Sequence, residues 1–262
     1  MNAEKAITYG IKSYVALLVA VLVLPLVIVI AVSFTPGMFM RFPPDGLSLE
    51  WYVAFFTSFE WLVALENSLT IAAGATVVGL SVGGTLAYAL DRYEYPFSSS
   101  LSTVGLFPIL LPPVIFGVAL LTLFLIVGIS GSIWSVMVAH GLFFSPFPFI
   151  LITQGLRELD RSHEEAAVIL GAAPLTVVRT ITYPLIRTNI VSAGVFVFIL
   201  SLNEYIIAWL LSNLVFTTIP IQIFSSLRYS YSPIIAAVST IFILSTVVFM
   251  IAIRWFTGGI WK

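Results

Sequence analysis

Few side chains of this sequence could do chemistry in an apolar environment. Within the apolar stretch 189–212, Glu204 is the single acid, flanked by Asn203 and Tyr205. A charge at the centre of a bilayer costs on the order of 3 kcal/mol, so it needs a partner or a wet cavity. Glu204 could attract a cation that crosses the membrane, or it could be paired to another helix or neutralised by a raised pKa. The residue types alone do not decide between these two interpretations of Glu204.

His140 lies in a second apolar stretch, 132–156. A lone buried histidine is usually a hydrogen-bonded structural residue, and a pair with Glu204 across the bundle is a hypothesis. The chain has two histidines and no cysteine, so no metal site is expected. It also lacks a P-loop and a nucleophile elbow. We therefore expect neither enzymatic activity nor a cofactor bound by this chain.

Helices must position these groups. The chain is 60% hydrophobic and 9% charged, against roughly 25% charged residues in soluble domains, so lipid must surround most of its surface. A net charge of -1 argues against a nucleic-acid partner. Because a span needs about 20 apolar residues, we predict an all-α integral membrane protein, one domain over 1–262, with six transmembrane helices at 13–34, 67–90, 101–127, 132–156, 189–212 and 234–256.

Proline and glycine mark special places in these stretches. Prolines in the third and fourth stretches predict kinks, formed either by packing alone or around a watery cavity. Gly79 and Gly83 form a pair that lets helix backbones approach closely. We expect that pair to pack within one subunit rather than across a dimer.

Basic residues set the expected orientation. With the N-terminus in the cytoplasm, only Arg41 and Arg228 lie outside, and an even number of spans places both termini in the cytoplasm. The first stretch is expected to be a retained helix. The outer segment 35–66 is expected to hold a short amphipathic helix at the membrane surface. The inner basic residues are Lys5, Lys12, Arg92, Arg157, Arg161, Arg179, Arg187, Arg254 and Lys262.

Charge is concentrated in the inner segment 157–188, which holds four arginines and four acids. Ser162 with Glu165 three positions later is typical of a capping box at a helix start. Gly171 and Pro174 predict the end of that helix and the start of another. Such a helix could dock into a partner's groove, but composition alone favours an ordinary surface loop.

A longer pattern decides between these two interpretations. It resembles the EAA motif of ABC importer permeases, whose pattern is Glu-Ala-Ala, three residues, Gly, nine residues, Ile, one residue, Leu-Pro. Here Tyr183 stands in the leucine position, which puts the packing before the fifth span in doubt. The matching residues are Glu165-Ala166-Ala167, Gly171, Ile181 and Pro184.

The resemblance covers nearly the whole chain and implies a type I importer permease. It implies that 157–188 is a cytoplasmic coupling loop seated in ATPase subunits, which carry the ATP and magnesium. It also implies an extracytoplasmic solute-binding protein, membrane lipid around the chain, and a second permease that is a related chain, or else an identical one. The location would be a bacterial or archaeal inner membrane. The expected ATPase-coupling residues are Glu164, Glu165, Ala166, Ala167 and Gly171.

Several stretches that are less specific than the EAA motif resemble the polyamine branch of this family. They include Pro112-Pro113-Val114-Ile115-Phe116-Gly117 and Ser201-Leu202-Asn203-Glu204-Tyr205. They imply transport of spermidine, putrescine or a similar small cation, with phosphonate or iron as the alternative. The expected path residues are Glu204, Asn203, Tyr205 and His140.

Three other classes remain as rivals at this stage. A secondary transporter could use Glu204 as a proton or cation site, although the two halves show no convincing internal repeat. A membrane enzyme would need several catalytic groups clustered at one depth of the membrane. One acid and one histidine are too few for such a cluster. An assembly scaffold would carry no solute.

Overall fold

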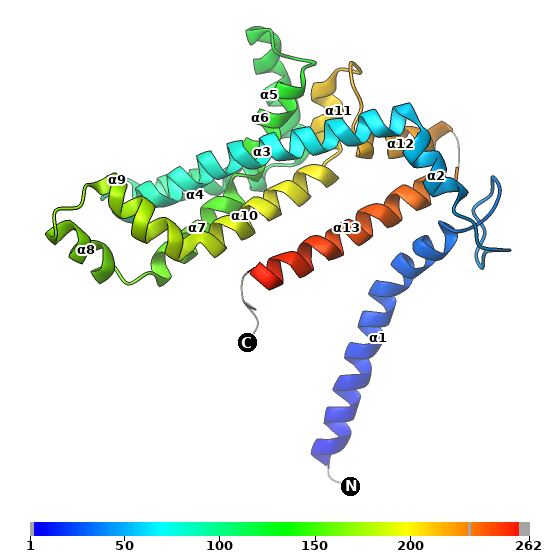
Figure 1. Cartoon of the computed structure of the whole chain (residues 1–262), viewed down its shortest axis with the longest axis horizontal. Coiled ribbons are helices and arrows are strands. Elements are labelled where there is room, and N and C mark those ends of the chain that lie inside the picture. The colour runs from blue at the N-terminus through cyan, green and yellow to red at the C-terminus, as the bar shows by residue number, and fades with distance from the viewer. Residues whose placement is uncertain (1–2, 230–231, 257–262) are drawn as a thin grey trace. The chain divides into compact units, whose positions relative to one another are not determined.

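The protein is described by a computed structural model that covers residues 3–229 and 232–256. In that described part every regular element is a helix (Figure 1). The elements are α1 (Ala3–Val32), α2 (Glu50–Thr57), α3 (Phe59–Arg92), α4 (Ser98–Leu110), α5 (Pro113–Val127), α6 (Ile133–Phe144), α7 (Pro146–Glu158), α8 (Ser162–Ile169), α9 (Pro174–Val177), the π-helical turn η1 (Val178–Thr182), α10 (Tyr183–Asn203), α11 (Ile206–Ser212), α12 (Ile219–Tyr229) and α13 (Ile234–Phe256).

Internal contacts divide the chain into two compact units. Among the described residues, one unit holds 3–62 together with 223–229 and 232–248, and the other holds 63–222 together with 249–256. The first therefore contains α1, α2 and most of α13. The second contains most of α3 and every helix from α4 to α11.

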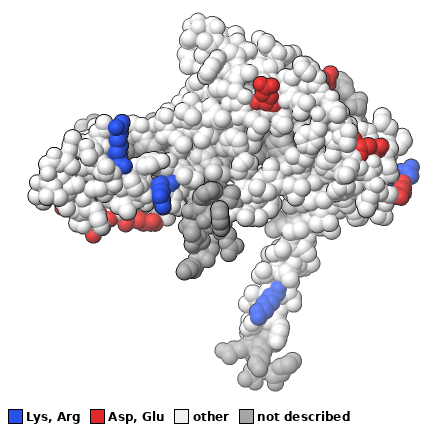
Figure 2. Space-filling model, in the orientation of Figure 1, with Lys and Arg blue, Asp and Glu red and all other residues white. Residues whose placement is uncertain are grey.

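Four described helical segments are long and apolar enough to span a membrane, and two bent helix pairs could raise the number to six. The four are Ile7–Val32, Phe59–Arg92, Pro174–Asn203 and Ile234–Ile251. Charged side chains are sparse on the face in Figure 2, as lipid contact requires. A multi-pass helical membrane protein is thus confirmed, with four to six candidate spans.

The stretch 101–127 is interrupted at its prolines, as predicted, but the interruption is a break between two helices and not a kink within one. This stretch forms α4 and α5, whose axes are bent by 101°. Pro112 and Pro113 explain the break, because a residue before proline is pushed into extended conformation. Leu111 and Pro112 are both extended, with ψ near 140° and 135°, and Pro113 opens α5 at the helix start where a proline is tolerated. The stretch 132–156 is also divided, at Ser145–Pro146, with a milder 45° bend.

The predicted fifth span, 189–212, is wrong at both ends. Its helix begins earlier, at Pro174, and continues through η1 to Asn203. It stops because Glu204 adopts an extended backbone with ψ 125°. The remaining residues form the separate short helix α11. Glu204 therefore lies at a helix break rather than deep inside a continuous span.

Close backbone contacts hold the second unit together. A methyl group on Gly79 would lie 3.3 Å from the Gly141 carbonyl oxygen of α6 and from Val197 Cγ1 of α10. One on Gly83 would collide with the Ser145 carbonyl oxygen and lie 2.8 Å from the Phe149 nitrogen. The glycine pair of α3 thus packs inside one subunit, as predicted. Figure 1 shows α3 running alongside α10.

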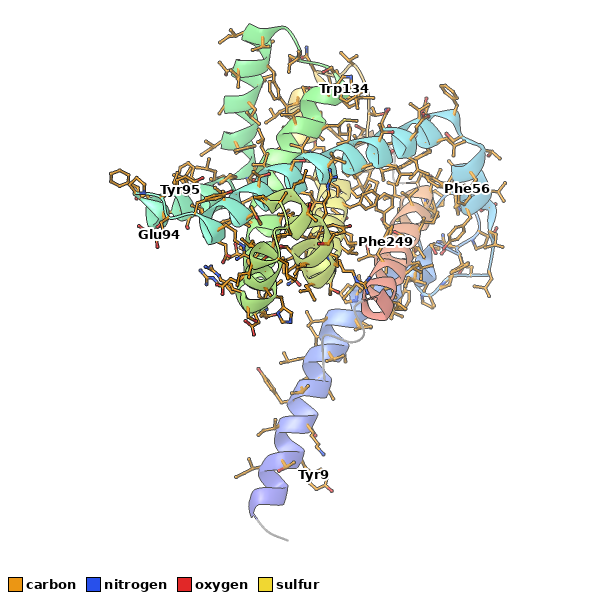
Figure 3. The ribbon with its side chains drawn as sticks, turned by 60° about the vertical axis from the view of Figure 1, so that its left-hand side comes forward. Tyr9, Phe56, Glu94, Tyr95, Trp134 and Phe249 are labelled. Atoms are coloured by element: carbon orange, nitrogen blue, oxygen red, sulfur yellow. The ribbon has the colours of Figure 1, made fainter. Side chains whose placement is uncertain are left out.

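The first unit is built around the end of α1. The hydroxyls of Ser33 and Tyr52 are 2.6 Å apart, and Trp51 Nε1 donates to the Thr35 carbonyl oxygen at 3.1 Å. These bonds fix α2, which confirms a short helix in 35–66. Along α1 itself only 6% of the most apolar window is buried, and side chains such as Tyr9 project freely from it (Figure 3). Its surface is thus free for lipid or another chain.

Candidate functional site

The helix α8 begins at Ser162, one residue earlier than it would if Ser162 were its N-cap, and Arg161 holds the N-cap position. The predicted capping box is therefore wrong. The start is instead stabilised by Asp160, whose Oδ1 accepts a hydrogen bond from the Ser162 backbone nitrogen at 2.9 Å. That bond lowers the pKa of the Asp160 carboxyl below its usual value. Glu164 and Glu165 lie in the first turn, as predicted, where the helix dipole favours acids.

The end of α8 depends on Gly171. This residue has φ +86°, a left-handed conformation that disfavours residues with a Cβ. The Ala172 nitrogen donates to the Ala167 carbonyl oxygen at 3.0 Å, and the Gly171 nitrogen donates to that of Val168 at 2.9 Å. These two bonds form a Schellman motif, so the glycine of the pattern is a conformational requirement. The predicted helix end and the restart at Pro174 are confirmed.

Glu164 ties α8 to the rest of the second unit. Its carboxylate lies 2.7 Å from a terminal nitrogen of Arg92, at the end of α3, and it accepts a hydrogen bond from the Thr182 hydroxyl of η1. Arg92 also pairs with Asp91, and Arg161 donates to the Asp91 backbone oxygen at 2.9 Å and to its carboxylate at 3.2 Å. Two arginines and two acids thus balance, and they bind the start of α8 to the end of α3.

No pattern in the sequence singles out Arg92 or Thr182 as a coupling residue. The partner of Arg92 lies 72 positions away, and no local pattern links the two residues. Besides Glu164, four residues were expected at the coupling contact. Glu165 forms no side-chain bond to another element in the described part of the chain, and alanine and glycine at 166, 167 and 171 have no side-chain group that could form one. The five expected coupling residues therefore separate into one anchoring acid, Glu164, and four residues on a surface without such bonds.

That free surface is apolar at its tip. Ile169 and Leu170 are 84% and 87% exposed, and Val168 and Leu175 are more than half exposed. Large apolar side chains on a short helix flanked by charges are typical of a protein-binding surface. The run Val168-Ile169-Leu170 carried this signal in the sequence, because three consecutive large apolar residues are unusual in a segment rich in charge. Tyr183 is also more than half exposed, so tyrosine in place of leucine needs no internal space.

A second polar cluster lies at the break after α10. His140 Nε2 is 3.1 Å from Glu204 Oε2, and His140 Nδ1 is 2.8 Å from Ser201 Oγ. The His140 side chain is 1% exposed and that of Glu204 is 8% exposed. The hypothesised pair across the bundle is therefore present, and α6 and α10 are joined through it.

Glu204 also begins the next helix. Its carboxylate accepts hydrogen bonds from the backbone nitrogens of Ile207 at 2.9 Å and Ala208 at 3.0 Å. These are among the first nitrogens of α11, which have no partner within their own helix. The single acid of the apolar stretches is thus fully engaged by internal donors.

The neighbours of Glu204 take different positions. Asn203 is exposed, and its Nδ2 donates to the Ile199 carbonyl oxygen of its own helix at 2.7 Å. The ring of Tyr205 stacks on that of Trp209, with centroids 6.4 Å apart. Of the four expected path residues, the structure brings His140 and Glu204 together and leaves Asn203 on the surface.

Comparison with known proteins gives relatives over most of the chain. The spermidine/putrescine transport system permease protein PotC of Haemophilus influenzae is 30% identical over 233 residues, 89% of this chain and 90% of that protein. The putrescine transport system permease protein PotI of Escherichia coli K12 is 36% identical over 220 residues, 80% of this chain and 77% of that protein.

The fold itself has a solved counterpart. A crystal structure of a bacterial ABC transporter involved in the import of the polysaccharide alginate contains a chain with TM-score 0.71 and 16% identity, covering 97% of this chain and 98% of that one. Fold and relatives together define a permease subunit of an ABC importer. Residues 77–262 match the family of binding-protein-dependent transport system inner membrane components, and the chain belongs to that family. It is a transport component and not an enzyme.

Proposed function

We propose that this chain forms half of the translocation path for a polyamine or similar small cation and is driven by an ATPase through α8. The observation that carries the coupling part is the shape of α8. One side is bonded to α3 and η1 through Glu164, while the tip at Ile169 and Leu170 is exposed. A partner that seats this tip can push on the spans through the anchored side.

The partners follow from this arrangement and from the family. The exposed tip, together with Glu165, Ala166, Ala167 and Gly171, would enter a groove of an ATPase subunit that holds ATP and magnesium. A second permease, a related but different chain, would complete the path. A solute-binding protein would deliver the solute on the outer side. The excess of basic residues on one side supports cytoplasmic N- and C-termini in an inner membrane.

The path would pass the break between α10 and α11. Broken helices survive at membrane depth where protein or a watery cavity satisfies the freed backbone groups, and transporter sites are often built there. Asn203 and Tyr205 would border the path. Because Glu204 is occupied by His140 and two backbone nitrogens, its part would be to hold α11 in place and to add negative potential.

The substrate class rests on the two polyamine permease relatives. The complex, reconstituted in proteoliposomes with its ATPase, partner permease and binding protein, should hydrolyse ATP faster when spermidine or putrescine is present. A phosphonate or ferric iron should give no stimulation. Stimulation by a phosphonate or by ferric iron, and not by polyamines, would show that the proposed substrate is wrong. It would leave the permease function unchanged.

The coupling claim has its own test. Glu165→Arg reverses the charge of an exposed residue that has no side-chain partner among the described residues, so the subunit should still fold and insert. Stimulation should disappear if this face seats in the ATPase. The matched control is Glu94→Arg, an exposed acid between α3 and α4 that has no side-chain partner among the described residues. Native-like stimulation in Glu165→Arg would rule out this face as the coupling contact.

A further inference from the structure

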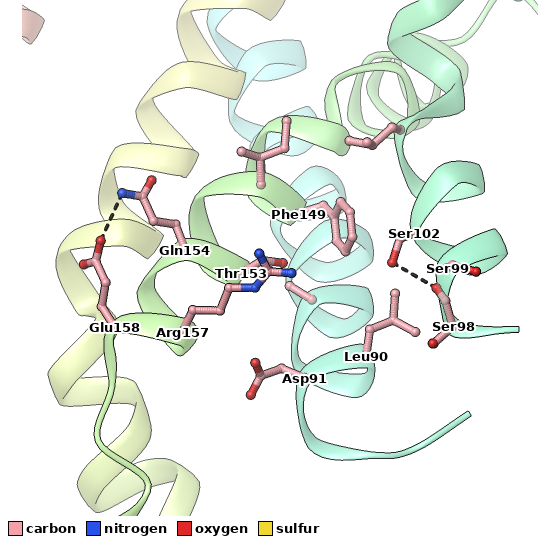
Figure 4. Close-up of a pocket in the computed structure, with 13 residues that line it drawn as sticks. Leu90, Asp91, Ser98, Ser99, Ser102, Phe149, Thr153, Gln154, Arg157 and Glu158 are labelled. Atoms are coloured by element: carbon pink, nitrogen blue, oxygen red, sulfur yellow. Dashed lines mark hydrogen bonds between the residues drawn. The ribbon is translucent and has the colours of Figure 1, made fainter. Parts of the chain in front are cut away.

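A cavity lies between the ends of α3, α4 and α7 in the second unit. Its volume is about 720 Å³ (Figure 4). One part of its wall is apolar and includes Leu106, Phe149 and Ile150. The other part is polar and includes Ser98, Ser99, Ser102, Thr153, Gln154 and Arg157. A ligand that fits both parts must have a polar head and an apolar body.

The lining holds two acids and one arginine, and of these three side chains only that of the arginine has no hydrogen-bond or ion-pair partner among the described residues. Asp91 is held by Arg92 and Arg161, and Glu158 Oε1 accepts a hydrogen bond from Gln154 Nε2 at 3.0 Å. Arg157 has no ion pair or hydrogen bond to the part of the chain that the structure describes. In Figure 4 its side chain extends from α7 toward the middle of the lining. A free guanidinium at this place favours an anion, and its planar set of donors suits phosphate.

Further donors converge on the same space. Thr153 Oγ1 is buried and has no hydrogen-bond partner among the described residues. Across the cavity α4 begins at Ser98, and no side chain caps its first turn. The start of a 13-residue helix carries partial positive charge. The hydroxyls of Ser98 and Ser99 can also donate to an oxyanion.

We propose that this cavity binds a phosphate-bearing anion, and that its source is the headgroup of an anionic phospholipid. Arg157 would meet the phosphate, with the start of α4 and Thr153 as further donors. The apolar wall would take the upper part of an acyl chain. Basic pockets between spans on the cytoplasmic side bind such headgroups in other membrane proteins. This site is separate from the path and from the tip of α8, and it does not depend on which solute is carried.

Photolabelling tests the site in the assembled complex. Nanodiscs of phosphatidylcholine would contain a minor fraction of photoreactive phosphatidylglycerol, and labelled peptides would be mapped by mass spectrometry. Label is expected in 98–106 and 149–158. Arg157→Gln should lower it roughly five-fold, as about one lost charge contact implies. Arg187→Gln removes an exposed arginine with no described partner elsewhere on this unit and should leave the label unchanged.

Two further arms separate the alternatives. Ser99→Phe fills the cavity without changing charge and should also lower the label. An excess of inorganic phosphate should not remove it, whereas removal would assign the site to a soluble phosphate compound in place of a lipid. Equal labelling by photoreactive phosphatidylcholine, or an equal loss in both arginine variants, would overturn the proposal. Because label is read on this chain directly, failure of an ATPase to associate is a separate result.

Discussion

His140 and Glu204 meet at 3.1 Å although 64 positions separate them, and the carboxylate that His140 contacts is also the cap of α11. One acid thus fixes the angle between two helices and starts a third. This makes Glu204 a residue whose structural and transport effects can be measured separately.

Glu204→Gln should destabilise the subunit. The amide keeps the shape but has one acceptor oxygen and no negative charge, whereas both carboxylate oxygens accept hydrogen bonds from the start of α11 and one of them also meets His140. A weakened helix cap costs about 1 kcal/mol. The midpoint of thermal unfolding of the purified complex should fall. Asn203→Ala, at an exposed neighbour, should leave that midpoint unchanged and lower solute uptake if the side chain borders the path. A lower midpoint in Asn203→Ala alone would contradict this division.

Glu164→Gln should loosen α8. The change removes the ion pair with Arg92, whose side chain is only 12% exposed, and hydrogen bonds to charged groups contribute about 1.5–3 kcal/mol. Limited proteolysis of 159–173 should accelerate several-fold. Glu165→Gln is the matched control, because that neighbouring acid is exposed and has no side-chain partner. Equal cleavage rates in the two variants would show that Glu164 is no anchor.

Gly83→Ala should damage the packing of α3. The new methyl would meet backbone atoms of Ser145 and Phe149, which cannot move away as a side-chain end can. Overpacking of this kind costs about 1–3 kcal/mol. Gly84→Ala is a close control, because its methyl would meet only Ile152 Cδ1, at 3.1 Å. Denaturant unfolding of the two variants should differ in midpoint, with Gly83→Ala the lower.

Gly171→Ala should alter the tip of α8 through its backbone. A residue with a Cβ in the left-handed region costs roughly 1 kcal/mol, whereas asparagine tolerates that region better. Gly171→Ala should reduce solute-stimulated ATP hydrolysis, and Gly171→Asn should restore part of it. Equal activity of both variants, at either the native or the reduced level, would argue against conformation as the reason for this glycine.

Hydropathy predicted the helices but not their interruptions. In the apolar run 189–212 the polar residues Asn203 and Glu204 stand at the break between α10 and α11, but no proline or glycine marks the break. The break depends on Glu204 reaching the nitrogens of Ile207 and Ala208, which is a contact and not a propensity. At Pro112–Pro113 the sequence did predict a disturbance, because proline acts through its own covalent geometry. Its size, 101°, depends on the packing around it.

The candidate site was also predictable only in part from the sequence. The position of α8 and its glycine stop were predictable because their signals are local. The anchoring of Glu164 by Arg92 was not, because it joins two segments far apart in the chain. The pair of His140 and Glu204 could be proposed from the sequence, since two isolated polar groups in apolar helices gain most by meeting each other.

The bent pair α4 and α5 also bears on the surrounding lipid. At about 1.5 Å per residue, their 13 and 15 residues reach about 20 Å and 23 Å, less than the roughly 30 Å of hydrocarbon in a bilayer. Neither half can match that thickness alone. Acyl chains next to this pair must shorten locally or give way to a neighbouring subunit. Hydrophobic mismatch at this bend therefore links the assembly of the transporter to the thickness of its membrane.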